Sequence, residues 1–406
     1  MNVFAKWFQL MVLSVAVLLA MSLWFSATAV IPQLRNVWQL TPALESWLTM
    51  SVQLGFVAGA LISATFNLAD RYSTRHVFAV ACTLSALFND IIAITNPGPE
   101  ISIFLRFLCG MALAGVYPPA IKLVTTWCQK DLGLGIGILI GALTIGSAAP
   151  HLFNALPMLG LNGMPQWDII LHQSSLLAYI AALLIILVFH NGPYAKPRAL
   201  FSWQQITRTW HHKPTRLANF GYLGHMWELY AMWAWVPLLI LYSYENAGLS
   251  MANARWAAFG IIAAGALGCI LAGAFADRYG RTAITSVSMA VSGSCALVAG
   301  FFFQSPVLLT IICGIWGFAV IADSAQFSAA VAELSVPENI GTALTLQMCL
   351  GFLLTLVTIR IIPELGEHFG LQNVMWVLAI GPAIGIWSML CLRRLPEARM
   401  MAHGKR

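Results

Sequence analysis

The chain has 406 residues, of which 59% are apolar and only 9% are charged. Soluble domains carry roughly 25% charged residues, so this chain cannot cover a water-facing surface and is predicted to lie in a lipid bilayer. The net charge of +6 is spread over many loops and not gathered on one face, which argues against a nucleic-acid-binding protein.

Apolar runs of about 20 residues recur along the chain, each long enough to cross the hydrocarbon core of a bilayer as a helix. The sequence therefore predicts an all-α integral membrane protein with twelve membrane-spanning helices. Their ranges are 7–31, 44–67, 77–95, 101–124, 133–157, 168–190, 217–242, 253–275, 283–303, 306–332, 341–363 and 372–392. The first run has 25 residues, too many for the apolar region of a signal peptide, and we expect it to be retained.

The cations favour one side of the membrane when the predicted helices are threaded alternately. With the N-terminus inside, sixteen of the 21 Lys and Arg residues fall in inside loops or tails, and only Arg35, Arg255 and Arg360 lie outside. Cytoplasmic segments are enriched in such residues, so both termini are predicted to be cytoplasmic, in a cell inner membrane of bacterial type.

Residues 191–216 separate the sixth run from the seventh and contain five cations and three prolines. We predict that they form a cytoplasmic linker between two six-helix bundles, 1–190 and 217–392, with 393–406 as a cytoplasmic tail. Aromatic and aliphatic residues recur in the linker at near-helical spacing. It is therefore either an amphipathic helix on lipid headgroups or a solvated basic loop.

A short charged turn between two apolar runs occurs twice. Residues 69–72, Ala-Asp-Arg-Tyr, are repeated 207 residues later at 276–279, and a further cation follows each copy, Arg75 in the first and Arg281 in the second. Repetition at half the chain length predicts two related six-helix halves. Because six is an even number, both halves have the same orientation, which places a cavity between them near mid-membrane.

The second copy resembles Gly-x-Leu-x-Asp-Arg-x-Gly-Arg, the signature loop of the major facilitator superfamily of transporters. It has Phe275 in place of Leu, and the first copy has Phe66 and Ser73 in place of the two glycines. The resemblance covers the whole chain and implies a central site lined by the first, fourth, seventh and tenth helices. It also implies a gating role for the charged residues of both loops, Asp70, Arg71, Arg75, Asp277, Arg278 and Arg281.

Charged side chains within the apolar runs are few, and each is expected to face a cavity or a partner, since a charge at the bilayer centre costs about 2.5–3.5 kcal/mol. Arg106 lies in the fourth run on one helical face with Gly110 and Tyr117, and it resembles the family's Arg-x-x-x-Gly motif. We expect Arg106 to bind an anion or relay a proton. The alternative is a buried ion pair with a carboxylate such as Asp90.

The seventh run carries a stripe of polar and aromatic residues, Tyr222, His225, Glu228, Met232 and Trp235, at steps of three or four residues. Glu228 is predicted to load and unload the coupling proton, and His225 could share that proton or hold the carboxylate charged. A hydrogen bond between helices is the alternative role for Glu228. No third ligand is nearby in sequence, so no metal site is expected.

The tenth run adds Asp323, the second carboxylate within an apolar run, and Gln326 on the same face. The predicted site for substrate and proton is made of residues from the fourth, seventh and tenth runs. They are Arg106, Tyr117, His225, Glu228, Trp235, Asp323 and Gln326.

These features predict a secondary transporter that moves a small polar or anionic organic solute by alternating access, with proton symport as the expected coupling. The alternative within this class is a proton-coupled exporter of drugs or metabolites, although the fifth run has Ala142 and Ile145 where such exporters have Pro and Gly. A transporter-like sensor would need a soluble output domain, and no segment outside the runs is long enough for one.

An enzyme is not expected, because no nucleophile is paired with a base, and direct ATP drive is not expected without a Walker loop. No cofactor is predicted. The expected partners are a small-molecule substrate, protons and membrane lipids, and the protein is predicted to function as a monomer.

Overall fold

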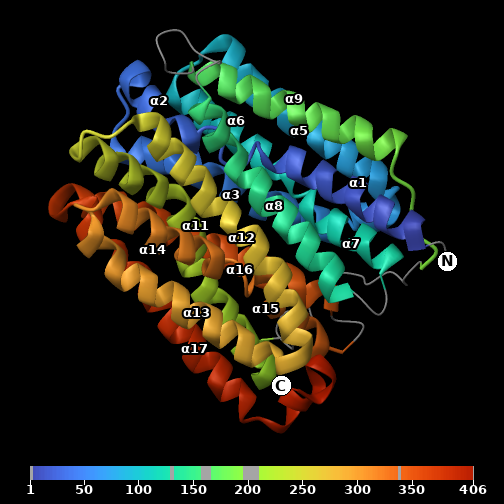
Figure 1. The fold of residues 1–406 in the computed structure, drawn as a ribbon. Coiled ribbons are helices and arrows are strands. Elements are labelled where there is room, and N and C mark those ends of the chain that lie inside the picture. Colours follow the sequence, from blue (N-terminus) through green and yellow to red (C-terminus); the bar gives the residue numbers. More distant parts are fainter. Residues whose placement is uncertain (1–2, 129–131, 157–165, 195–209, 337–339, 406) are drawn as a thin grey trace.

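The computed structural model describes residues 3–128, 132–156, 166–194, 210–336 and 340–405, which form a bundle of long helices (Figure 1). The first half contains α1 (Val3–Met21), η1 (Thr28–Val30), α2 (Ile31–Trp38), α3 (Pro42–Thr65), α4 (Leu68–Arg71), α5 (Thr74–Thr95), α6 (Pro99–Leu113), α7 (Tyr117–Trp127), α8 (Leu132–Ala155) and α9 (Trp167–Leu187). The second half contains α11 (Lys213–Asn246), α12 (Met251–Tyr279), α13 (Arg281–Val298), η4 (Ala299–Phe302), α14 (Pro306–Val320), α15 (Ser324–Leu334), α16 (Ile340–Phe369), η6 (Leu371–Asn373), η7 (Met375–Ala379), α17 (Ile380–Arg393), η8 (Pro396–Met400) and η9 (Ala402–Gly404).

Within the described ranges, eleven helical segments are long and apolar enough to cross a membrane. The other long helix, α11, has 34 residues and carries His225, Glu228 and Asn219 along its length. The all-α membrane fold predicted from the sequence is confirmed, and most predicted helix ends lie within about four residues of the observed ends. Most of the predicted linker, residues 195–209, lies outside the described residues, so the bundle boundaries at 190 and 217 stay predictions.

Three crossings that the sequence predicts as single helices are interrupted. In the first crossing, α1 ends at Met21, and the chain continues through turns and η1 into α2. The fourth crossing is broken at residues 114–116 and the tenth at residues 321–323. The residues at the breaks are mostly apolar and give no signal of their own. Pro118 directly after the fourth-crossing break fits the first turn of a new helix, where its missing N–H does no harm.

The two halves repeat at the same offset as the charged loops. Helices α6 and α14 begin at Pro99 and Pro306, 207 residues apart, and the breaks that follow them have the same separation. Gly110 and Gly317 are related in the same way. A Cβ added to Gly110 would collide with the carbonyl oxygen of Val52, and one added to Gly317 with that of Ile261. The close contact of α3 with α6 is thus repeated between α12 and α14.

The halves meet along two helix pairs, α3 with α16 and α8 with α12. The repeat relates these pairs to each other, because α12 corresponds to α3 and α16 to α8. Both chain ends lie at one end of the bundle, which we call the terminal end, and α2 lies at the opposite or far end (Figure 1).

The first prediction concerns the repeated glycine contact. Gly317→Val should lower stability by about 1–3 kcal/mol, because the added carbons would force α12 and α14 apart. Gly314→Val is the matched control, since a Cβ there meets no atom within 4 Å. The midpoint of thermal unfolding in detergent should fall for Gly317→Val only. An equal fall in both variants would show that helix propensity, and not the close contact, sets the cost.

Candidate functional site

Six aromatic rings meet between the two halves near the middle of the long helices, and we call them the central cluster. The first half contributes Trp24, Phe25 and Phe56, and the second half contributes Tyr230, Trp233 and Phe352. Ring centroids are 4.7 Å apart for Phe56 and Phe352 and 5.4 Å apart for Trp24 and Phe352. In this conformation, ring contacts therefore close the centre of the molecule.

The central cluster contains polar groups that have no protein partner. The indole Nε1 atoms of Trp24 and Trp233 are buried and lack a hydrogen-bond partner among the described residues, and so do both amide atoms of Gln53, one turn from Phe56 on α3. Burying an unpaired polar group costs about 1–3 kcal/mol. These donors are therefore free to bind a ligand that enters between the rings.

The interrupted first crossing is held by Arg106 on α6, which is fully buried. Its Nη1 donates to the carbonyl oxygen of Leu23 (2.8 Å), and its Nη2 donates to that of Trp24 (2.5 Å). Nη1 also lies 3.1 Å from Ser26 Oγ and 3.2 Å from Asn89 Oδ1. Arg106 adds donors to the broken helix, where the Leu23 carbonyl oxygen also accepts from Ser26 Oγ (3.0 Å), and so it fixes the backbone that carries Trp24 and Phe25.

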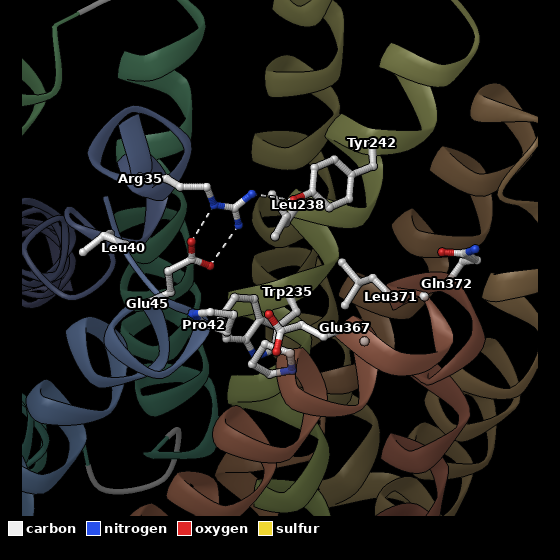
Figure 2. Close-up of a pocket in the computed structure, with 13 residues that line it drawn as sticks. Arg35, Leu40, Pro42, Glu45, Trp235, Leu238, Tyr242, Glu367, Leu371 and Gln372 are labelled. Carbon is white, nitrogen blue, oxygen red and sulfur yellow. Dashed lines mark hydrogen bonds and ion pairs between the residues drawn. The ribbon is translucent and has the colours of Figure 1, made fainter. Parts of the chain in front are cut away.

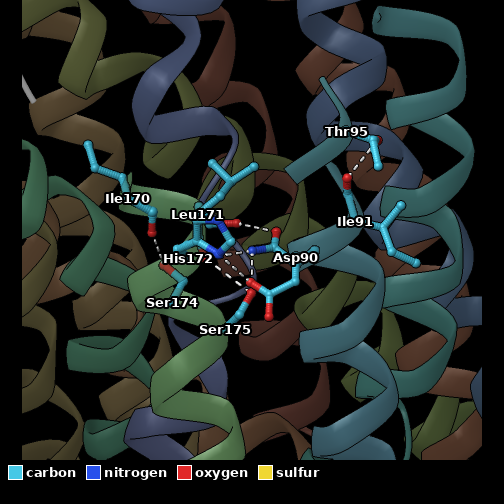
Figure 3. A network of polar contacts seen from close by, with 10 residues as sticks. Asp90, Ile91, Thr95, Ile170, Leu171, His172, Ser174 and Ser175 are labelled. Atoms are coloured by element: carbon cyan, nitrogen blue, oxygen red, sulfur yellow. Dashed lines mark hydrogen bonds and ion pairs between the residues drawn. The ribbon is translucent and has the colours of Figure 1, made fainter. Parts of the chain in front are cut away.

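The alternative prediction for Arg106, an ion pair with Asp90, is not found. Asp90 Oδ1 lies 2.9 Å from His172 Nδ1 on α9, as Figure 3 shows. Its neighbour Asn89 also contacts α9, where it donates to the carbonyl oxygen of Leu171 and to Ser175 Oγ. The polar side chains of α5 therefore tie this helix to α9.

The polar stripe of α11 divides between two partners within the second half. His225 Nδ1 lies 2.8 Å from Asp323 Oδ1, and both side chains are only 1% exposed. Glu228 accepts hydrogen bonds from Ser292 Oγ and Trp316 Nε1, each at 2.7 Å. His225 is thus paired with Asp323 and not with Glu228, and the Glu228 bonds match the helix-to-helix alternative. Its role as proton carrier stays a prediction.

The other predicted site residues lie in different surroundings. Trp235 Nε1 donates to the carbonyl oxygen of Ile359 (3.1 Å), while Tyr117, the first residue of α7, packs against the hydrophobic core. Gln326 Oε1 accepts from Arg281 Nη1 (2.7 Å), which places it next to the second charged loop. The predicted set is therefore spread over several clusters of contacts, and no further observation tests its role.

The second charged loop forms an ion-pair network at the terminal end. Arg281 lies 2.6 Å from Glu333 and 3.8 Å from Asp277. The carboxylate of Asp277 reaches the start of α8, where a Cβ added to Gly133 would lie 3.1 Å from Asp277 Oδ2. A carboxylate at this position interacts favourably with the positive end of the helix dipole, as expected for a contact that closes this end.

The first charged loop is bonded within its own half. Arg75 donates to the carbonyl oxygens of Ile185 and Ile186 at the end of α9. Arg278 of the second loop stacks over the ring of Tyr279 at 5.4 Å. Asp70 and Arg71 belong to α4, and the side chain of Asp70 lies outside what the structure describes. The gating roles of both loops stay predictions.

A pocket of about 540 Å³ opens at the far end between the halves (Figure 2). Its charged lining residues among those described are Arg35, Glu45 and Glu367. Arg35 contacts Glu45 through two hydrogen bonds, of 2.5 and 2.9 Å, and it crosses to the second half through Tyr242 Oη at 2.9 Å. The hydrogen bond to Glu45 raises the pKa of Arg35 above its ordinary value, so its charge is kept.

Sequence reasoning missed the central cluster and the far-end pocket. Gln53 carried the one usable signal for the cluster, because an amide inside an apolar run needs a partner. Arg35 had been predicted only as a cation on the outer side, and Glu45, within the second predicted run, had not been singled out. The described residues contain no group of three or more His, Cys, Asp or Glu side chains that could hold a metal ion.

Comparison with known proteins gives concordant results. The family model of the Major Facilitator Superfamily matches residues 12–322. The chain is 25% identical over 310 residues to a niacin transporter of Acinetobacter baylyi, covering 69% of this chain and 68% of that protein. It is 24% identical over 344 residues to a benzoate transport protein of the same organism, covering 76% of this chain and 72% of that protein.

Solved structures support the fold. A D-xylose-proton symporter superposes with a TM-score of 0.76 at 14% identity, covering 98% of this chain and 99% of the other. A bacterial homologue of the human lysosomal transporter Spinster gives a TM-score of 0.72 at 14% identity, covering 97% and 98%. The chain belongs to the major facilitator superfamily and is a multi-pass secondary transporter of a small molecule, not an enzyme.

The second prediction tests the role of Arg106. Arg106→Gln should lower stability by about 1–3 kcal/mol for each carbonyl oxygen left without a donor, and it should raise the substrate KM by displacing Trp24. Asp90→Asn is the control, because Asp90 pairs with the partly exposed His172 instead. Thermal unfolding and transport assays would measure both effects. If Asp90→Asn lowered stability and raised KM as much as Arg106→Gln does, an ion pair between Arg106 and Asp90 would be supported instead.

Proposed function

We propose that this transporter imports a small aromatic monocarboxylate together with a proton. The observation that carries the proposal is the central cluster, in which rings from both halves surround unpartnered indole N–H groups. An aromatic substrate could replace the ring contacts as the halves separate. Its carboxylate would accept hydrogen bonds from Trp24, Trp233 and Gln53, whose donors have no partner within the described part of the chain.

The named relatives support this substrate class. Niacin and benzoate are both flat aromatic rings that carry one carboxylate, and two separate relatives are named for them. The D-xylose-proton symporter shares the fold alone, and a sugar would need more polar side chains than the central cluster offers. An aromatic acid is therefore the substrate class that suits both the rings and the free donors.

The proton is proposed to bind in the second half. Asp323 lies at the break between α14 and α15, where its carboxylate is buried and its partner, His225, is itself titratable. Glu228 instead accepts from two neutral donors, so a proton on Glu228 would not change the charge of a titratable partner. We propose Asp323 with His225 as the first proton site and Glu228 as the second, because a break can open when the halves move.

The terminal end is proposed to face the cytoplasm of a cell with an inner membrane, since most cations lie in segments of that end. The third prediction follows from it. A cysteine placed at the exposed His403, in a protein without its own cysteines, should resist an impermeant thiol reagent added to intact cells. Permeabilised cells provide the positive control. Labelling in intact cells would show the opposite orientation, in which the far-end pocket faces the cytoplasm.

The fourth prediction tests substrate and coupling together. Purified protein in liposomes should accumulate labelled benzoate or niacin when the outside is made more acidic, and D-xylose should not accumulate. Asp323→Asn keeps the size of the side chain but cannot load a proton. It should abolish accumulation while exchange of labelled for unlabelled benzoate continues, because exchange does not require release of the proton.

Glu228→Gln is the matched comparison in the same half. If accumulation survives in Asp323→Asn and fails in Glu228→Gln, the proton sites exchange roles. If both variants still accumulate benzoate, coupling lies elsewhere in the chain. Benzoate that leaves liposomes against its gradient as protons enter would favour the exporter alternative and overturn import.

A further inference from the structure

We propose that the far-end pocket is a second substrate site, at which the carboxylate of the arriving substrate replaces Glu45 on Arg35 once Glu45 has taken up a proton. The inference rests on the proposed function, because it requires a carboxylate substrate. It adds a capture site outside the central cluster and a protonation step that precedes binding at the centre.

The geometry favours an exchange of carboxylates. Arg35 holds Glu45 through Nε and Nη2, the paired donors that match the two oxygens of a carboxylate. The Arg35 side chain is 41% exposed, whereas Glu45 is only 3% exposed. An incoming carboxylate can therefore reach the guanidinium from the pocket, which Arg35 and Glu45 both line (Figure 2).

The charges of the pocket set the order of events. The titratable groups facing it are Arg35 on α2, Glu45 on α3, Tyr242 on α11 and Glu367 on α16. With Tyr242 neutral and both carboxylates ionised, the lining carries a net charge of −1, which repels an anion. A proton on Glu45 removes one negative charge and frees the paired donors of Arg35. One proton and one anion then enter with no change in net charge.

The pocket shares two lining residues with a smaller cavity next to the first crossing. Trp235 and Leu238 line both this pocket and a smaller cavity beside Thr28, His151 and Asn154. That cavity borders η1, which follows directly from the interrupted first crossing. A substrate released from Arg35 would thus pass Trp235 to reach the central cluster, which contains Trp233 of the same helix.

Binding at Arg35 would also weaken closure of the far end. The Arg35 Nη1 bond to Tyr242 Oη joins the two halves there. A substrate carboxylate that replaced Glu45 on Nε and Nη2 and drew the guanidinium toward the pocket would stretch this Nη1 bond. Capture of substrate and opening of the far end are therefore coupled through one side chain.

The experiment is the dependence of benzoate transport on the pH of the solution at the far end. In wild-type liposomes the KM for labelled benzoate should fall as that solution is acidified. The internal pH and the membrane potential are held fixed. Glu45→Gln mimics the protonated form, so its KM should be low at every pH. We expect it to lie at least about tenfold below the wild-type value at the alkaline end, a difference of about 1.4 kcal/mol.

Glu367→Gln is the matched control. It removes a negative charge from the same pocket but does not contact Arg35, so its KM should keep the wild-type pH dependence. Arg35→Gln alone would leave Glu45 buried without a partner and could unfold the protein. The double variant Arg35→Gln/Glu45→Gln avoids this problem. It should raise KM at least about tenfold at all pH values.

The outcomes separate the two proposals. If Glu45→Gln keeps the wild-type pH dependence, or if the double variant has the wild-type KM, the capture site is wrong while the proposed function stands. If the wild-type protein transports neither benzoate nor niacin at any pH, the substrate class is wrong and the capture site is overturned with it.

Discussion

The hydrogen bonds from Arg106 to the carbonyl oxygens of Leu23 and Trp24 are the interaction on which the rest of the site depends. A membrane has no water to satisfy backbone groups, so a broken helix in its interior needs donors from the protein. A guanidinium provides several donors in a fixed plane, which suits two adjacent carbonyls. The cost of burying its charge is offset by these bonds, and the break then turns Trp24 and Phe25 toward the second half.

The two halves have the same architecture but different chemistry. Their fourth and tenth crossings break at equivalent residues, yet the last residue of the break is Val116 in the first half and Asp323 in the second. Arg106, which is fully buried, lies in the first half, and the carboxylates Glu228 and Asp323, each 1% exposed, lie in the second. The repeat therefore supplies a common scaffold. Both halves contribute rings to the centre, and we propose that the second half holds the protons.

The sequence predicted the features that depend on the length of apolar runs or on the internal repeat. It predicted the twelve crossings, and it located the charged loops because their motif recurs at a fixed offset. The breaks escaped because residues such as Ala114 are as apolar as their neighbours. The partners of Arg106 escaped because backbone carbonyls do not appear in a sequence. The central cluster escaped for a third reason: aromatic residues are common in apolar runs, and only tertiary contacts distinguish Phe56 from the others.

Contacts between the halves differ in kind along the axis of the bundle, and this difference bears on how the molecule could move. The centre is joined by apolar rings, whose attraction is non-directional and survives small shifts. The ends are joined by polar groups, Arg35 with Tyr242 at one end and Asp277 against α8 at the other. A polar contact near water contributes little to the stability of a closed end, about 0–1 kcal/mol for an exposed ion pair. Binding of one proton or one anion can therefore decide whether that end is open or closed. We therefore propose that the contacts at the ends control alternating access, while the ring contacts between them tolerate the movement.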